Sequence, residues 1–423
     1  MDQNSTLSTL NREDTGRAGD PTCTPAAPCG PASESSYKAP DSCQGSLRKG
    51  LPDLQAEVEA VKDLSDCRLC PRDCRVNRLK GEKGFCGEGG TIRTARAALY
   101  YTEEPVISGS RGSGTVFFAG CNLGCIYCQN RQISRPGASP SGALEKDTSS
   151  ISDSLSSVSR QNVSGQNLSG QNLSGKRKSP PRLPEISPER MAEIFLELQE
   201  QGAHNINLVT PEHFVPLLIP ALRRAKKQGL SIPVVYNTGS YERVEAVKAL
   251  EGLVDVWLPD LKYVSSALSA RHTGAGDYFQ YASAAIAEMV RQCPEPVFSD
   301  GSHTIDCPDD ADDPIMVHGV LVRHLALPGC GEDSRAILRY LYETYGDRIF
   351  ISIMNQYTPM PQVLHSHPDP DLCRRLSEAE YEALVDFAID LGITNGFIQE
   401  SGTVSPSYIP VFDGTGILPA ARR

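Results

Sequence analysis

Long apolar runs are absent from this chain of 423 residues. A helix that spans a membrane needs about 20 mostly apolar residues, and no stretch of that kind occurs. The N-terminal region also lacks the basic block followed by an apolar block that marks a secretory signal peptide. We therefore expect a cytoplasmic protein that has no membrane partner.

An excess of basic residues is missing as well. The chain has 41 Lys and Arg against 52 Asp and Glu, which gives a formal net charge of -11. Nucleic-acid affinity comes mostly from clustered Lys and Arg, so this balance argues against a nucleic-acid partner. It favours a small molecule or a protein as the substrate.

Apolar periodicity is lacking in two segments. Residues 1–50 are rich in Ser, Pro, Gly and Asp, and residues 138–184 contain the direct repeat QNVSG, QNLSG, QNLSG. Such segments bury too little apolar surface to offset their ordering entropy. The predicted organisation is a disordered tail over 1–50, a Cys-rich extension over 51–100, a core over 101–137 and 185–413, a low-complexity insertion over 138–184 and a tail over 414–423.

Short β-rich runs alternate with helical patterns between these segments. The strand runs are TVFFA at 115, INLV at 206, PVVYN at 233, VDVWL at 254, VLVRHL at 320, IFISIM at 349 and NGFI at 395. Helical patterns begin at 188, 215, 241, 334 and 378, and most of them end at a glycine. Repeated βα units predict an α/β fold with a parallel sheet, here a partial (βα)6-type TIM-like barrel with an N-terminal Cys-rich metal-binding extension and disordered insertions.

Polar residues follow several of the predicted strands. They include Thr210, Pro211 and Glu212, then Asn237 and Thr238, then Asp260 and Lys262, and finally Tyr357. Functional groups of βα barrels gather at the carboxyl ends of the strands, so we expect these residues to share one rim. Asp260 and Lys262 either position a substrate or simply pair with each other. Tyr357 is either a radical relay or an ordinary exposed loop residue.

Cysteine is plentiful, with 14 residues, and without an export signal this count favours metal ligation over disulfides. Three of these residues, Cys121, Cys125 and Cys128, directly follow the first predicted strand. Their spacing on a glycine-containing loop lets three sulfurs bind one face of a four-iron cubane. The fourth iron then has no protein ligand and stays open.

This C-x3-C-x2-C motif resembles the signature of the radical S-adenosylmethionine (SAM) superfamily. The resemblance implies a [4Fe-4S] cluster on the three cysteines and SAM bound at the open iron, with Tyr127 near the adenine. It also implies a mechanism, in which the reduced cluster breaks the sulfur–C5′ bond of SAM. The resulting 5′-deoxyadenosyl radical then abstracts a hydrogen atom from the substrate.

The runs CNLGCIYCQN, NLVTPEHF, VVYNTGSYE, WLPDLKY, VLVRHLALPG and SIMNQYTP resemble, more narrowly, the pyruvate formate-lyase activating-enzyme-like branch. By that resemblance Thr210, Pro211 and Glu212 cradle the methionine amino group, although the two glycines typical of that position are absent. Asn237 and Thr238 would contact the ribose or the methionine, and Arg323 would lie near the cofactor. The alternatives are an ordinary Thr-Pro turn and a salt-bridge role for Arg323 inside the barrel.

A second group of cysteines, Cys67, Cys70, Cys74 and Cys86, lies upstream. Four thiolates at this spacing suit structural zinc, and a second iron–sulfur cluster would accept the same ligands. The sequence leaves both open, and the further alternative is that these thiols are unligated or redox-active. Basic residues between these cysteines either offset thiolate charge or dock an acidic electron donor; they are Arg68, Arg72, Arg75, Arg78, Lys80 and Lys83.

These patterns together predict an enzyme that generates a 5′-deoxyadenosyl radical, with activation of a glycyl-radical enzyme as one use of it. The expected partners are a flavodoxin- or ferredoxin-like electron donor and, for that use, the glycyl-radical enzyme. One alternative is radical modification of another protein or of a small molecule. The non-enzymatic alternative is an adaptor protein in which both cysteine groups hold zinc.

Overall fold

The computed structural model describes residues 7–9, 63–135, 183–303, 314–366, 369–399 and 409–419. Within the segment 1–50 it describes the short strand β1 (Leu7–Thr9), and the other residues of that segment lie outside the described ranges. Almost all of the segment 138–184 also lies outside them, so disorder there stays a prediction. No helix within these ranges combines the length and the apolar character needed to cross a bilayer.

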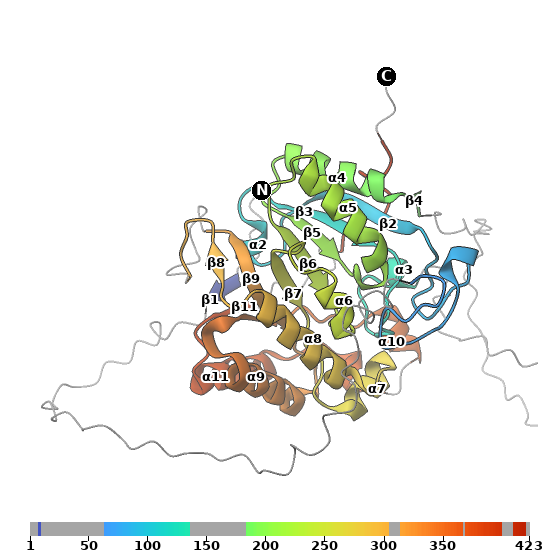
Figure 1. The fold of residues 1–423 in the computed structure, drawn as a ribbon. Helices are drawn as coiled ribbons and strands as arrows, with labels where there is room; N and C mark the ends of the chain where they lie inside the picture. The colour runs from blue at the N-terminus through green and yellow to red at the C-terminus, as the bar shows by residue number, and fades with distance from the viewer. Residues whose placement is uncertain are drawn as a thin grey trace, which may run out of the picture.

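Eleven strands form one mixed sheet at the centre of the molecule (Figure 1). Seven of them run parallel in chain order: β3 (Ser113–Phe118), β5 (Ile206–Val209), β6 (Val234–Thr238), β7 (Val256–Pro259), β9 (Met316–Leu325), β10 (Phe350–Met354) and β11 (Gly396–Gln399). All seven correspond to strands predicted from the sequence. The sheet is open, since its path begins at β1 beside β11 and ends at β4 beside β2, which is compatible with a partial barrel.

The sequence did not predict the antiparallel strands at the margins. Strand β2 (Ile92–Tyr100) pairs with β3, and β4 (Glu185–Ile186) pairs in turn with β2. Strand β8 (Val297–Phe298) pairs with β9. Their residues lack the β-branched runs of the parallel strands, so pairing with a neighbour determines their conformation more than their own propensity does.

Helices cover the outer side of the sheet (Figure 1). The five predicted ones are α4 (Pro188–Glu200), α5 (Val215–Lys227), α6 (Val244–Lys248), α9 (Gly331–Tyr345) and α11 (Glu378–Leu391). Helix α4 begins as expected, because the Ser187 side chain accepts a hydrogen bond from the Arg190 N–H and Pro188 occupies the first turn. Two further helices, α7 (Ser266–Thr273) and α8 (Tyr278–Gln292), were not predicted. Short α2 (Pro105–Ser108), α3 (Arg131–Ser134) and α10 (Pro361–Ser366) lie in connections.

Successive residues of the parallel strands alternate between two apolar layers, as strand geometry requires. One set, which includes Tyr236 and Trp257, packs with the helices in the largest cluster of buried residues. The other set, which includes Val235, Leu258 and Leu321, forms a separate cluster on the inner side of the sheet. This inner cluster fills the lower part of the partial barrel and leaves the carboxyl ends of the strands for polar groups.

Candidate active site

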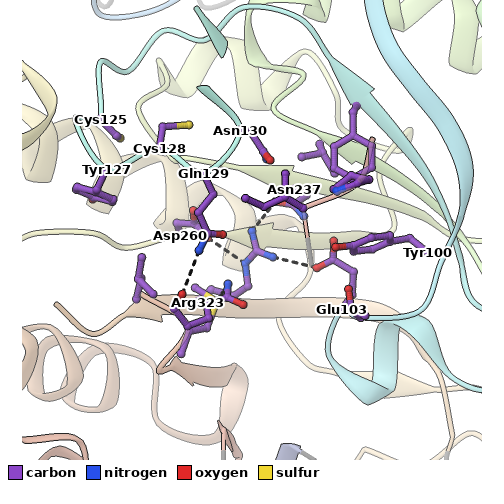
Figure 2. A pocket seen from close by; sticks show the side chains of 18 of the residues that line it. Tyr100, Glu103, Cys125, Tyr127, Cys128, Gln129, Asn130, Asn237, Asp260 and Arg323 are labelled. Atoms are coloured by element: carbon purple, nitrogen blue, oxygen red, sulfur yellow. Dashed lines mark hydrogen bonds and ion pairs between the residues drawn. The ribbon is translucent and has the colours of Figure 1, made fainter. Parts of the chain in front are cut away.

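The inner face of the sheet becomes polar toward the carboxyl ends of the strands. Asn237, Asp260 and Arg323 each stand two positions after an apolar residue of the inner layer, so they point to the same side. The Arg323 guanidinium donates to Asp260 Oδ1 at 2.9 Å, to Asn237 Oδ1 at 2.5 Å and to Glu103 Oε2 at 3.1 Å (Figure 2). Three strand ends are thereby connected through one guanidinium.

Lys262 extends this network, because its Nζ lies 2.6 Å from Asp260 Oδ2. Burial alone would raise the pKa of Asp260, but the charges of Lys262 and Arg323 prevail and hold that pKa below its usual value. Burial raises the pKa of Glu103 to about 7 despite the opposing charge of Arg323. Asp260 is therefore the permanent anion of the network, whereas Glu103 is poised to change its charge near neutral pH.

A cavity of about 230 Å³ opens beside this network. Figure 2 shows Tyr127, Cys125 and Cys128 at one end of it and Glu103 with Tyr100 at the other, with Arg323 between them. Apolar side chains complete part of the wall, among them Phe117, Val209, Leu325, Met354 and Ile409. The cavity thus brings together residues from both parts of the predicted core.

The cysteine loop begins where β3 ends. Cys125 and Cys128 line the cavity, and Cys121 lies behind them with its Sγ accepting the Leu123 N–H at 3.3 Å. Burial raises the pKa of Cys125 to about 11 and also raises that of Cys121. A bound metal supplies the positive charge that converts such thiols into thiolate ligands.

No group of three or more Cys, His, Asp or Glu side chains in the described ranges converges to hold a single metal ion. A [4Fe-4S] cluster does not require such convergence, because each cysteine binds a different iron. Three partly buried cysteines on one loop, two of them facing a cavity, therefore fit a cluster better than a mononuclear ion.

The residues that follow β5 do not line this cavity; they are Thr210, Pro211 and Glu212. Glu212 is instead bonded to Thr238. Glu212 Oε1 accepts hydrogen bonds from the Thr238 hydroxyl and from the Gly239 N–H, each at 2.8 Å. Its Oε2 is buried and has no hydrogen-bond partner among the described residues. Thr210, two residues earlier, has a left-handed φ of 58°, which is unusual for a β-branched residue.

This arrangement fits an incoming ammonium group. Glu212 is close enough to Cys121 for its charge to raise the pKa of that thiol, so the unpaired oxygen lies near the cysteine loop. An ammonium placed beside Glu212 Oε2 would donate a hydrogen bond to this unpaired oxygen. Its positive charge would also offset the desolvation cost of the buried carboxylate. Pro211 is the N-cap residue of the short 3₁₀ turn Glu212–Phe214.

Tyr127 belongs to a buried chain of hydrogen bonds that the sequence did not reveal. Its hydroxyl is 3.0 Å from the Tyr263 hydroxyl, which lies 3.1 Å from His272 Nδ1. His272 Nε2 lies 3.0 Å from the Asp369 carboxylate. Because a carboxylate only accepts, His272 Nε2 carries the proton of its contact with Asp369. The chain fixes the ring of Tyr127 at the cavity wall.

Tyr357 lies in a loop, as one of its two alternatives expected, but it is not exposed. It is 2% exposed, its hydroxyl donates to the Leu372 carbonyl at 2.5 Å, and its ring stands edge-on to Tyr127 at 6.3 Å. Its ring packs against the Tyr127 ring and does not line the cavity. Glu103 was missed in turn because β2, the strand that precedes it, was not predicted.

Most of the basic residues beside the upstream cysteines are engaged within the protein. Arg78 is buried and donates to the Gly89 and His213 carbonyls, while Arg68 and Arg75 pair with Asp66. Arg72 is bonded to backbone carbonyls of the core. Arg68, Arg75, Lys80 and Lys83 are nevertheless exposed, so docking of an electron donor beside these cysteines stays a prediction.

Comparison with known proteins agrees with the cysteine geometry. Residues 115–294 match the family model described as the Radical SAM superfamily. An uncharacterized protein of Methanocaldococcus jannaschii is 25% identical over 346 residues, which cover 81% of this chain and 79% of the relative. This relative therefore extends the similarity beyond the matched domain without naming an activity.

Two solved structures are similar over part of the chain. Streptococcus suis SuiB bound to its precursor peptide SuiA has 9% identity and a TM-score of 0.37, covering 67% of this chain, which spans about half (47%) of SuiB. A domain of a pyruvate-formate lyase-activating enzyme from Bacteroides vulgatus has 16% identity and a TM-score of 0.29, covering 44% of this chain and 92% of that domain. TM-scores this low support no conclusion about substrate.

The match spans β3, the cysteine loop and the strands that supply Asn237 and Asp260. The superfamily implies an iron–sulfur cluster and SAM as cofactors, and the buried thiols and the stranded Glu212 oxygen fit both. Residues 115–294 of this chain are therefore similar to the domain that defines the radical SAM superfamily.

Proposed function

We propose that the protein is an enzyme that reductively cleaves SAM, with Cys121, Cys125 and Cys128 as the ligands of a [4Fe-4S] cluster. The observation that carries this proposal is the position of Cys125 and Cys128 in the wall of a cavity walled also by buried charges. When bound, the cluster supplies the electron that breaks the sulfur–C5′ bond and yields a 5′-deoxyadenosyl radical for hydrogen abstraction.

The chain's own residues bind and orient the reactants. Glu212 offers its unpaired oxygen to the methionine ammonium, and Tyr127 is held rigidly where it can contact the adenine. The network of Arg323, Asp260 and Lys262 gives the cavity a fixed polar floor whose donors are already oriented. Apolar side chains around the cavity limit water access, which protects a radical from side reactions.

The proposal places the substrate at the end of the cavity opposite the cysteines. Tyr100 and Glu103 form that end (Figure 2). A substrate hydrogen donor placed there lies across the cavity from the cysteine loop, with Arg323 beside it. Because the pKa of Glu103 is raised to about 7, this carboxyl can present either a donor or an acceptor to the substrate near neutral pH.

Activation of a glycyl-radical enzyme is the use of the radical that we propose first. Its support is the resemblance of the motif runs to the activating-enzyme-like branch. A flavodoxin- or ferredoxin-like protein would supply the electron. Mixing the reduced protein and SAM with a glycyl-radical enzyme encoded nearby should give a glycine-centred EPR signal. If that signal is absent while SAM is cleaved, the substrate is a different protein or a small molecule.

The cleavage reaction is tested with anaerobically purified protein. The wild type should be brown and, once reduced, should release 5′-deoxyadenosine from SAM. Cys125→Ala should lose both the cluster absorbance and the product, because a cubane with one missing ligand is not retained. Cys373→Ser is the matched control, since this exposed thiol does not line the cavity, and it should keep full activity. Colourless protein that contains zinc and releases no product would establish the adaptor alternative instead.

A further inference from the structure

The upstream cysteines surround a second, much smaller cavity. Cys67, Cys70, Cys74 and Cys86 all line it, together with apolar side chains such as Leu69 and Val76. Its volume of about 10 Å³ holds roughly one water-sized atom. Asp73, Arg78 and His213 also line this space. Four thiols around a space for one atom match the ligand set of a metal centre.

Backbone amides point at three of these four sulfurs. The Phe85 N–H donates to Cys74 Sγ at 3.3 Å, and the N–H groups of Arg72 and Glu88 bond the sulfurs of Cys70 and Cys86, each two residues earlier in the chain. A thiol is a weak acceptor, whereas a metal-bound thiolate carries the charge that makes such bonds strong. The Leu123 N–H likewise donates to Cys121 Sγ, which lies two residues earlier in the chain. Cysteines of both groups therefore accept a hydrogen bond from a nearby backbone amide.

The backbone around Cys74 is held in an uncommon conformation. Asp73 and Arg75, the two residues that flank it, have left-handed φ values of 43° and 59°. Gly84 approaches so closely that a Cβ there would lie 2.7 Å from Cys74 Sγ. Conformations of this kind persist where the surroundings over-determine them, and ligand-binding loops are a frequent setting.

This cysteine segment lies directly against the loop of the proposed cluster. The Arg72 side chain stacks on Phe85 at 3.7 Å and donates to the Asn122 carbonyl at 2.9 Å. Arg135 donates to the carbonyls of Phe85 and Cys121, both at 2.9 Å. The two loops therefore share hydrogen-bond donors, and a change in the shape of one is transmitted to the other.

We propose that Cys67, Cys70, Cys74 and Cys86 bind a second metal centre, which fixes the loop that packs against Cys121. The four side chains do not converge as a ready-made set in the described structure, so metal binding draws the thiols inward and releases their protons. A zinc ion and an iron–sulfur cluster would take the same four thiolate ligands.

The test is the metal content of the full-length protein, which does not depend on SAM cleavage. A variant with Cys121, Cys125 and Cys128 all replaced by Ala should lose the first cluster and keep either about one zinc or about four irons per chain. The variant Cys70→Ala/Cys86→Ala should lose that second component. Cys373→Ser is the control for thiol removal and should change neither count.

The wild-type count decides the question even where a variant fails to fold. About four irons with one zinc, or about eight irons, supports the second centre and identifies its metal. About four irons with no other stoichiometric metal overturns it, even where SAM cleavage is normal. A protein with the second metal but without SAM cleavage would instead overturn the proposed function and leave this centre standing.

Discussion

Arg323 is the central residue of the polar network in the site, because its guanidinium neutralises two buried carboxylates at once. Its partners Glu103 and Asp260 come from segments far apart in the chain, and both are largely excluded from solvent. Removing one partner from a buried ion pair costs about 3–5 kcal/mol, since the stranded charge keeps its desolvation penalty. The arginine is thus a structural requirement as well as a candidate for substrate contact.

We predict that Arg323→Ala lowers the free energy of unfolding by about 3–5 kcal/mol at pH 8 and by less at pH 6. The pKa of Glu103 is already raised to about 7 and rises further without the guanidinium, so the folded variant holds a proton that the unfolded chain releases. Its stability therefore falls as the pH rises through that range.

Denaturant unfolding at both pH values measures this difference. Adding Glu103→Gln to Arg323→Ala should recover part of the loss at pH 8, because one of the two stranded charges is then absent. A loss that is equal at both pH values, with no recovery in the double variant, would show that Glu103 is not coupled to Arg323.

At the scale of elements, the approach of the two cysteine segments depends on Gly120, which lies between β3 and Cys121. Its φ is 80°, and an added Cβ would lie 2.7 Å from the Cys86 carbonyl oxygen. No side chain larger than hydrogen fits without moving one segment away from the other. The glycine thus serves the contact between the loops as well as the turn.

Gly120→Ala is expected to destabilise the protein by about 1–3 kcal/mol more than Gly202→Ala. Gly202 is the matched control, because its φ of 90° is also left-handed but nothing lies within 4 Å of an added Cβ. In both variants the left-handed backbone conformation costs roughly 1 kcal/mol. Only in Gly120→Ala does the new Cβ also clash with the Cys86 carbonyl oxygen. Thermal unfolding and iron content measure the two effects, and equal values for the two variants would contradict the close approach.

Elements with strong local signals were predictable from the sequence. Each parallel strand is a short β-branched or aromatic run before a polar residue, and α4 carries both its Ser187 cap and Pro188. Strand β2 was not, because alternating Arg and Ala do not resemble a strand until β3 pairs with them. Helix α7 begins in a Ser- and Ala-rich segment with little apolar periodicity, so its helical state depends on packing against α8.

The candidate site divides in the same way. The spacing of Cys121, Cys125 and Cys128 is a local signal, and it located the loop that faces the cavity. The chain from Tyr127 through Tyr263 and His272 to Asp369 joins residues up to 242 positions apart, which no local pattern encodes. Only the fold brings these groups together.

At the scale of the whole molecule, residues 409–419 close one edge of the sheet. The Ala97 N–H donates to the Thr415 carbonyl and the Gly414 N–H donates to the Ala95 carbonyl, each at 2.9 Å, so this segment pairs with β2. Ile417 is fully buried there, and Ile409 reaches the wall of the large cavity. The end of the described chain thus protects a strand edge and helps to shape the site.

Ile417→Ala should lower the free energy of unfolding by about 2–5 kcal/mol, because it leaves a cavity beneath the segment. Leu418→Ala is the matched control, since the neighbouring side chain is 63% exposed and its truncation should cost less than about 0.5 kcal/mol. Thermal melts give the stabilities. Limited proteolysis should cut the segment faster in Ile417→Ala only, and equal cleavage of both variants would contradict this attachment.

The contacts of Arg72 have a consequence for the order of events during synthesis. All seven cysteines of the two groups lie between residues 67 and 128, yet Arg72 is held by the carbonyls of Thr273 and Gly274. The Ile126 N–H likewise bonds the His272 carbonyl. A nascent chain therefore exposes its thiols well before it contains the residues that support them. Metal insertion into the finished geometry has to wait until translation has passed residue 274.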